Sequence, residues 1–166
     1  KQVLGDNHPH TLRIMGHLAS TYSVRGEHRK AEGLNLIRLE KQKQLLGENH
    51  PKTLLIMGHL ATTYSALVEH QRAKELNIIV VEKQKQILGA NHPDTMQIMG
   101  NLASTYSNLG EHQTAKELNI IVLEERKQVL GDSHPDTLCT MGVLWVIWPS
   151  HIQTWESIKW PKNSGL

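Results

Sequence analysis

The sequence predicts an all-α fold, a solenoid of stacked helical hairpins. The main observation is an internal repeat, because residues 5–46, 47–88 and 89–130 align at a spacing of 42 residues. The second and third copies are identical at 29 of their 42 positions. Each copy has two stretches with apolar residues at helical spacing, separated by a turn. Neither helix can bury its apolar face alone, whereas stacked copies can, so the repeat predicts a solenoid.

The first helix of each copy is predicted to follow a His-Pro pair. Pro51 suits the first helical position, where a missing N–H group costs nothing and φ is already helical. Asp94 and Asp136 follow the matching prolines in later copies and place negative charge at the positive end of the helix dipole. The helical pattern of the second copy is carried by Leu54, Met57, Leu60, Ala61 and Tyr64. We expect Ala61 to allow close helix approach and Tyr64 to fill the space between helices.

The turn of the second copy is predicted at Leu67–His70, where the apolar pattern is interrupted. The corresponding turns of the first and third copies hold Gly26 and Gly110, whereas this one holds Val68 at the same slot. Glycine adopts positive φ without steric cost, so two turns have a suitable residue and one does not.

The second helix is predicted from about Gln71 to Leu88. Its apolar stripe consists of Ala73, Leu76, Ile79 and Val80. Gly89 follows and is predicted to end the helix as a left-handed cap. Gly47 and Gly89 join one copy directly to the next, so the array is expected to contain no linkers.

These motifs resemble a known family. The small and aromatic positions of LAxTY, followed by alanine and leucine in the second helix, resemble the tetratricopeptide repeat. The 42-residue length and the phrase LGxxHPxTLxxMxxLA resemble the repeats of kinesin light chains and the related arrays of NB-ARC-type receptor proteins. The resemblance covers residues 1–144 and implies a right-handed tetratricopeptide solenoid.

The predicted array has incomplete ends. Residues 1–4 match the end of a second helix, and residues 131–144 begin a fourth copy, so the chain is expected to be a fragment of a larger one. Trp145 then falls where three copies place alanine, and Pro149 would end the helix. The tail, residues 145–166, is either a divergent cap or sequence foreign to the array. We favour the second interpretation and predict that the tail does not complete a fourth repeat.

Composition excludes several classes of function. The net charge of +2 comes from interleaved acidic and basic residues, which gives no basic field for nucleic acid. No apolar run approaches the roughly 20 residues needed to cross a bilayer, so no membrane partner is expected. Cys139 is the single cysteine, so a disulfide within the chain is impossible and a reducing, cytoplasmic location is expected.

The sequence offers no catalytic or metal-binding motif. Most of the eleven histidines are multiplied by the repeat. His8, His50, His92 and His134 precede proline, where we expect them to shape the helix start. They lack cysteines or carboxylates at ligand spacing, and Cys139 lacks a nucleophile motif. We therefore predict no metal, no cofactor and no enzyme.

A polar strip on the first helices is the candidate binding site. In kinesin light chains, the position before Leu-Ala faces the concave groove and is commonly asparagine. The resemblance places His17, His59 and Asn101 at that position. Neighbours four or seven residues away are expected to share the face, namely Arg13, Thr21 and Val24; Leu55, Thr63 and Ala66; Gln97, Thr105 and Asn108. The alternative is a merely solvated surface.

The sequence thus predicts a protein-interaction scaffold that binds a peptide segment of a partner in a concave groove. The light chains' grooves carry more basic residues than this strip, which argues against an acidic cargo peptide. The segment that joins light chains to the motor heavy chain is absent, so motor association is not implied. A sensor array of an NB-ARC-type receptor is the alternative, and a hydrolase is the least favoured. Protonation of His17 and His59 near pH 6 is expected to favour acidic peptides.

Overall fold

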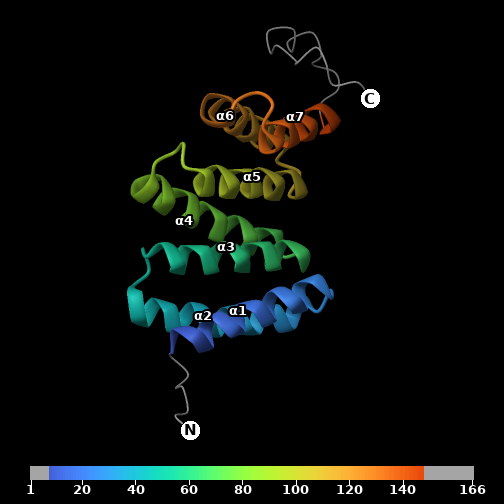
Figure 1. Cartoon of the computed structure of the whole chain (residues 1–166). Helices are drawn as coiled ribbons and strands as arrows, with labels where there is room; N and C mark the ends of the chain where they lie inside the picture. The colour runs from blue at the N-terminus through green and yellow to red at the C-terminus, as the bar shows by residue number, and fades with distance from the viewer. Residues whose placement is uncertain (1–7, 148–166) are drawn as a thin grey trace. The chain divides into compact units, whose positions relative to one another are not determined.

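The computed structural model describes residues 8–147, which form seven α-helices and no strand (Figure 1). The helices are α1 (Pro9–Val24), α2 (His28–Leu46), α3 (Pro51–Ala66), α4 (His70–Leu88), α5 (Pro93–Asn108), α6 (His112–Leu130) and α7 (Pro135–Ile147). Two compact units contain them: unit 1, Lys1–Gly89, holds α1 to α4, and unit 2, Ala90–Leu166, holds α5 to α7. The prediction of an all-α fold built from helical hairpins is confirmed.

The histidine of each His-Pro pair caps the helix that follows. In α3, the Nδ1 atom of His50 accepts a hydrogen bond from the N–H group of Lys52 at 3.1 Å, and Pro51 takes the first helical position. The other three pairs repeat this bond through His8, His92 and His134. An imidazole nitrogen that accepts a hydrogen bond carries no proton, so these caps require that nitrogen to be unprotonated. The prediction that these histidines shape the helix start is confirmed.

The turn inside each hairpin has the same backbone path whatever residue it holds. Gly26 and Gly110 have φ angles of +77° and +78°, and Val68 has +63° at the equivalent position. After the turn, the N–H groups of Glu69 and Glu111 each donate to a tyrosine carbonyl at 2.9 Å. A left-handed conformation costs a non-glycine residue about 1–2 kcal/mol. The repeat packing therefore imposes on Val68 a conformation that suits glycine.

The glycines that end the second helices differ from the prediction in one respect. Gly47, Gly89 and Gly131 have φ between 87° and 95°, but their ψ angles lie between 161° and 168°. This is an extended conformation at positive φ and not the left-handed helical cap that we expected for Gly89. This extended conformation at positive φ is essentially restricted to glycine. These positions therefore require glycine more strictly than a left-handed helical cap would. The extended ψ sends the chain directly into the loop before the next first helix.

Unit 1 consists of two hairpins, α1–α2 and α3–α4, and α2 packs against α3. Its core is centred on Leu60, Tyr64 and Ala73, with partly buried Leu39, Leu67 and Leu76 around them.

Tyr64 is 3% exposed, as predicted. Its hydroxyl oxygen accepts a hydrogen bond from Nη2 of Arg72 at 2.6 Å, and the same guanidinium lies 3.9 Å from the ring centre. Ala61 and Ala73 are fully buried, which confirms the close helix crossing.

Unit 2 contains the hairpin α5–α6 and the helix α7, which packs against α6. Leu123, Met141 and Leu144 form the core at the α6–α7 contact, with Ile120 packed on it. Trp145 is 55% exposed, although its register partners in the repeat are buried alanines. Helix α7 continues through Trp145 to Ile147, beyond residue 144 where we placed the end of the array.

Two predictions concern residues outside the described range. The interpretation of residues 1–4 as a helix end falls on undescribed residues. So does the greater part of the tail, residues 148–166. That the tail fails to complete a fourth repeat therefore stays a prediction.

Candidate peptide-binding surface

The predicted strip of unit 1 lies on accessible parts of α1 and α3. Arg13, His17, Leu55 and His59 are all exposed, and Leu55 is 55% exposed. Arg13 donates a hydrogen bond from Nη2 to Nδ1 of His10 at 3.0 Å, one turn towards the start of α1. Val24, at the end of α1, is also exposed, so the strip presents two imidazoles, one guanidinium and two large aliphatic side chains to solvent.

The strip of unit 2 is more neutral. Gln97 and Asn108 are exposed, and Asn101 is half-buried. The side-chain amide of Gln97 donates to Oδ1 of Asn101 at 3.3 Å, so these two residues form a local amide pair on α5. Unit 2 offers hydrogen-bonding groups at the predicted positions but no fixed charge among them.

The threonines of the strip require a correction. Thr21 is exposed, but Thr63 and Thr105 are only 3% and 1% exposed, so they cannot form part of an accessible contact surface. Each of the three hydroxyls donates to the backbone carbonyl four residues earlier, at 2.8–2.9 Å. A step of four residues rotates a side chain by about 40° around the helix axis. All three threonines share this rotation, so the packing of neighbouring helices, which covers Thr63 and Thr105 but not Thr21, decides their burial.

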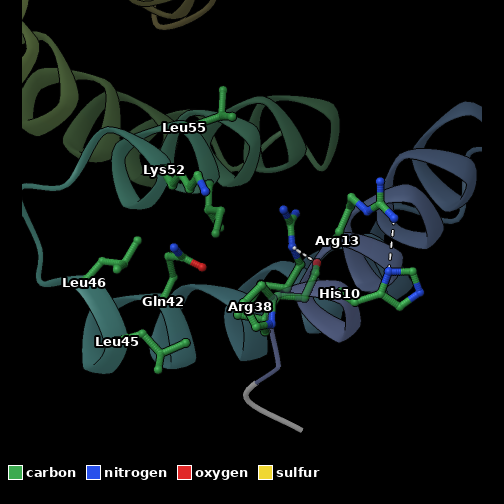
Figure 2. Close-up of a pocket in the computed structure, with 11 residues that line it drawn as sticks. His10, Arg13, Arg38, Gln42, Leu45, Leu46, Lys52 and Leu55 are labelled. Atoms are coloured by element: carbon green, nitrogen blue, oxygen red, sulfur yellow. Dashed lines mark hydrogen bonds between the residues drawn. The ribbon is translucent and has the colours of Figure 1, made fainter. Parts of the chain in front are cut away.

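A cavity of about 670 Å³ adjoins the strip of unit 1 (Figure 2). It lies between the first half of α1, the second half of α2 and the first half of α3. Its lining residues are Pro9, His10, Leu12, Arg13, Arg38, Gln42, Leu45, Leu46, Lys52, Leu55 and Ile56. The strip and the cavity share Arg13 and Leu55. The cavity therefore extends the predicted site from the first helices onto α2.

The charged residues of this cavity are all basic. Arg13, Arg38 and Lys52 line it together with His10, and no aspartate or glutamate is among the lining residues. Within residues 8–147, none of the three cations forms an ion pair with a carboxylate. Five aliphatic residues supply most of the remaining wall. The lining residues that the structure describes are thus apolar or basic, apart from Gln42.

Arg38 is the most enclosed of these cations. Its Nε atom donates to the carbonyl oxygen of Leu12 at 3.1 Å, and Nη1 donates to Oδ1 of Asn35 at 2.9 Å. Burial lowers the pKa of the Arg38 guanidinium, because desolvation disfavours the charged form. A Cβ atom at Gly16 would approach the guanidinium carbon of Arg38 to 2.8 Å. The absence of a side chain at Gly16 thus leaves room for Arg38 beside α1.

The charge of Arg38 reaches the strip. The side chain of His59 stays accessible to solvent, but partial burial, followed by repulsion from Arg38, lowers the pKa of its imidazole. A lowered pKa reduces the share of His59 that is charged near pH 6, compared with an ordinary histidine. The expected pH response of peptide binding stays a prediction, with a smaller contribution from His59, and the nearby cation on α2 is part of the reason.

Sequence reasoning missed the contribution of the second helices to this site. The signal was present, because polar residues recur in register where a buried helix face is expected. Asn35, Asn77 and Asn119 occupy one such position, and Gln42, Gln84 and Arg126 occupy another seven residues later; all six are buried. Residues seven apart share a helix face. Of these side chains, Gln42 lines the cavity between α2 and α3, and Arg126 donates hydrogen bonds from α6 to α7.

Unit 2 contains the equivalent junction, formed by α5, α6 and α7, with different residues. A shift of 84 residues places Asp94, Gln97, Val122, Arg126 and Asp136 at the positions of His10, Arg13, Arg38, Gln42 and Lys52. Arg126 is 8% exposed and donates from Nη1 to the carbonyl oxygen of Asp136 at 3.0 Å and to Oγ1 of Thr140 at 2.6 Å. This contact in unit 2 thus has two carboxylates, and one guanidinium that is hydrogen-bonded within the protein, in place of the cations that line the cavity of unit 1.

Other chemistry is sparse in the part of the chain that the structure describes. Among residues 8–147, no three histidine, cysteine, aspartate or glutamate side chains gather as a metal site would need. Within the same range, no helix is long and apolar enough to span a bilayer. Cys139, on α7, is exposed.

Comparison with known proteins identifies the repeat. A tetratricopeptide repeat family profile matches three consecutive segments, residues 11–52, 53–94 and 95–136. The chain belongs to the tetratricopeptide repeat family. Among curated proteins, none matches the chain.

Solved structures show similar repeats of the kinesin light chain type. A Podosopora anserina protein described as a kinesin light chain with nearly identical TPR-like repeats is 29% identical, with a TM-score of 0.74. A point variant of that protein, also 29% identical, has a TM-score of 0.77; in both cases the match covers 93% of this chain and 73% of the other. BtubC (BKLC) from P. vanneervenii is 18% identical, with a TM-score of 0.76 over 94% of this chain and 68% of its own, and it shows likeness of fold. The predicted kinesin light chain-like tetratricopeptide solenoid is thereby confirmed.

Proposed function

We propose that this protein is an interaction scaffold that binds a peptide segment of a partner protein along its first helices. The observation that carries the proposal is the exposed strip of unit 1 beside an open cavity. His17, His59 and Arg13 supply hydrogen-bonding groups there, and exposed Leu55 supplies an apolar contact. Leu45 and Leu46, also exposed, line the same cavity as Leu55, and a cluster of exposed apolar side chains at a recess is typical of an interaction surface.

An extended peptide suits this surface for a physical reason. Its backbone N–H and C=O groups need partners, and imidazole, guanidinium and amide side chains can supply donors and acceptors. The peptide's side chains would enter the cavity, where Leu45, Leu46 and Leu55 provide apolar walls. In unit 2, Gln97, Asn101 and Asn108 offer a second, neutral group of polar side chains. The corrected contact set excludes Thr63 and Thr105.

The kinesin light chain likeness supports a cargo-adaptor role in the cytoplasm as part of a larger chain. The alternative is a sensor array in an NB-ARC-type receptor, which the high identity of the second and third copies favours. The transcript that encodes this array discriminates between them. A coiled coil in the same polypeptide would support the adaptor, and a nucleotide-binding P-loop would support the receptor. In both cases we propose a protein partner, with no nucleic acid, membrane, cofactor or catalytic reaction.

The proposal is tested with a random dodecapeptide display library panned against the whole chain. Enriched peptides are then titrated by calorimetry against the wild type and the double variant His17→Ala/His59→Ala. We expect the double variant to weaken binding about tenfold or more, since each lost hydrogen bond is worth about 0.5–1.5 kcal/mol.

A matched control is Glu40→Ala/Glu82→Ala, which changes two exposed residues of the second helices. It should leave affinity unchanged, and far-ultraviolet circular dichroism should show the same helicity for all variants. Failure to enrich any peptide, or equal binding by the wild type and the histidine variant, would contradict the proposal.

A further inference from the structure

The cavity of unit 1 has a charge pattern that a generic peptide groove does not require. Three cations from three different helices, Arg13, Arg38 and Lys52, are among the residues that line this recess, and no acidic side chain is among the lining residues that the structure describes. Figure 2 shows the Arg38 guanidinium rising from α2 towards the space below α3, where Lys52 also lies. Burial of Arg38 disfavours the charged form of its guanidinium. An anion in the recess would offset this cost.

The combination of an arginine at position 38 and a lysine at position 52 occurs where α2 meets α3, and not at the equivalent positions of the later copies. Position 38 becomes Val80 and Val122 in the next two copies, and both valines are fully buried. The repeat therefore packs well with valine at this position, and an arginine is not needed for the fold. Lys52 has the register partners Asp94 and Asp136, which carry the opposite charge. Arg38 and Lys52 therefore place positive charge in unit 1 at positions where the later copies have valine or aspartate.

The number and kind of the cations indicate which anion fits. A carboxylate carries one negative charge and would leave two of the three cations uncompensated. A phosphomonoester carries a charge of about −1.5 to −2 near neutral pH and has three strong acceptor oxygens. A guanidinium presents its donors in a planar fork that matches phosphate oxygens, and a lysine ammonium adds a point charge. The aliphatic wall then contacts the residue beside the phosphorylated one.

We infer that the cavity of unit 1 is a phosphate-reading pocket that binds a phosphoserine or phosphothreonine side chain of the partner peptide. Arg38 and Lys52 hold the phosphate, and Arg13 contacts it from α1. This inference rests on the proposed function, since the pocket acts on the peptide that the strip holds. It makes the scaffold responsive to phosphorylation of its partner.

The test uses three synthetic dodecapeptide libraries with uncharged random positions and a fixed central residue: phosphoserine, serine or glutamate. Binding of each fluorescent library to the whole chain is measured by anisotropy. The phosphoserine library should bind at least about tenfold more tightly than the serine library, because charge-assisted hydrogen bonds are roughly twice as strong as neutral ones. The glutamate library should lie close to the serine library.

Two variants locate the effect. Arg38→Val reproduces the residue of the other copies, and Lys52→Asp reproduces the charge of Asp94 and Asp136 at an exposed site. Each should remove most of the preference for the phosphoserine library over the serine library. Arg25→Val is the matched control, because it removes the same charge from an exposed residue at the other end of α1. It should retain the preference.

A second readout identifies the pocket directly. A dianion beside Arg38 screens the repulsion that lowers the pKa of His59, so the imidazole should titrate at higher pH when a phosphopeptide is bound. Proton NMR of the His59 ring measures this shift. A phosphopeptide that binds without moving the His59 titration would place the site elsewhere and overturn the inference.

The remaining outcomes separate the two proposals. Equal binding of the phosphoserine and serine libraries, unaffected by Arg38→Val, overturns the phosphate pocket and leaves the peptide scaffold standing. Equal binding of the glutamate and phosphoserine libraries shows a carboxylate site and overturns the choice of phosphate. Absence of binding by all three libraries overturns the scaffold itself and the pocket with it.

Discussion

The contact between α2 and α3 in unit 1 and the contact between α6 and α7 in unit 2 are equivalent in the repeat but carry different charges. In unit 1, Arg38 extends from α2 beside Gly16 and joins two other cations around an open cavity. In unit 2, the guanidinium comes from Arg126, four positions further along the second helix in repeat register, and it is engaged in internal hydrogen bonds. Arg38 also donates internal hydrogen bonds, to the carbonyl oxygen of Leu12 and to Oδ1 of Asn35, but it lines an open cavity, whereas Arg126 is buried. Repeats with the same fold therefore differ in the charge at this contact.

The largest expected difference between the units is in the tyrosine of the first helix. Tyr64→Ala in unit 1 should cost about 3–5 kcal/mol, because it removes a buried aromatic ring. It also removes the hydrogen-bond partner of Arg72. Tyr106→Ala in unit 2 should cost less, since Tyr106 is half-buried and the position of Arg72 holds Thr114. Denaturation by urea measures both; a cost below about 1 kcal/mol for Tyr64→Ala would contradict its place in the core.

The two arginines should respond to removal in opposite ways. Arg126→Ala should destabilise the protein by about 1–3 kcal/mol, because it leaves the buried hydroxyl of Thr140 without this donor and opens a gap. Arg38→Val should be neutral or stabilising, since replacing a desolvated charge with a packed apolar side chain is often favourable. Urea denaturation of both variants decides the matter. Equal losses in the two variants would mean that Arg38 is also structural.

The hairpin turns allow a smaller, stabilising change. Val68→Gly should raise the free energy of unfolding by about 1 kcal/mol, because glycine accepts the positive φ angle that valine adopts with strain. Part of the gain is offset by the larger entropy of glycine in the unfolded chain. The reciprocal change Gly110→Val in unit 2 should destabilise by a similar amount. Thermal unfolding monitored by circular dichroism tests the pair, and an unchanged midpoint for Val68→Gly would show that the turn is unstrained.

The smallest effect concerns the pH response of His59. Its folded-state pKa lies below that of the unfolded chain, about 6.5, so the unfolded state takes up protons more readily. The associated stability is present above that pH and is lost as the pH falls below it. Arg38→Val should raise the titration midpoint of His59 and lessen this loss, whereas Arg25→Val should do neither. NMR titration of the ring protons measures the midpoint; no change in Arg38→Val would show that burial alone lowers the pKa.

Repetition determined most of the fold at the level of sequence. A His-Pro pair, a Leu-Ala pair and a glycine that recur every 42 residues predicted each hairpin. Helices α3 and α4 begin within one residue of the expected positions. These are local signals, because caps, turns and helix periodicity depend on residues close together in the chain. Burial of Ala61 and Tyr64 followed from the same periodicity.

The site was only partly accessible to such reasoning. The family resemblance placed His17 and His59 on an open face and helical spacing added Arg13 and Leu55, and the structure shows all four to be exposed. It could not separate Thr21 from Thr63, because their local sequences are alike and only the packing around the helix distinguishes them. Tertiary structure alone decided that Arg38 and Lys52 join Arg13 around one cavity, and that Arg38 lowers the pKa of His59. The physical reason is that charge–charge interactions and desolvation depend on distances through space, which a repeat pattern along the chain does not contain.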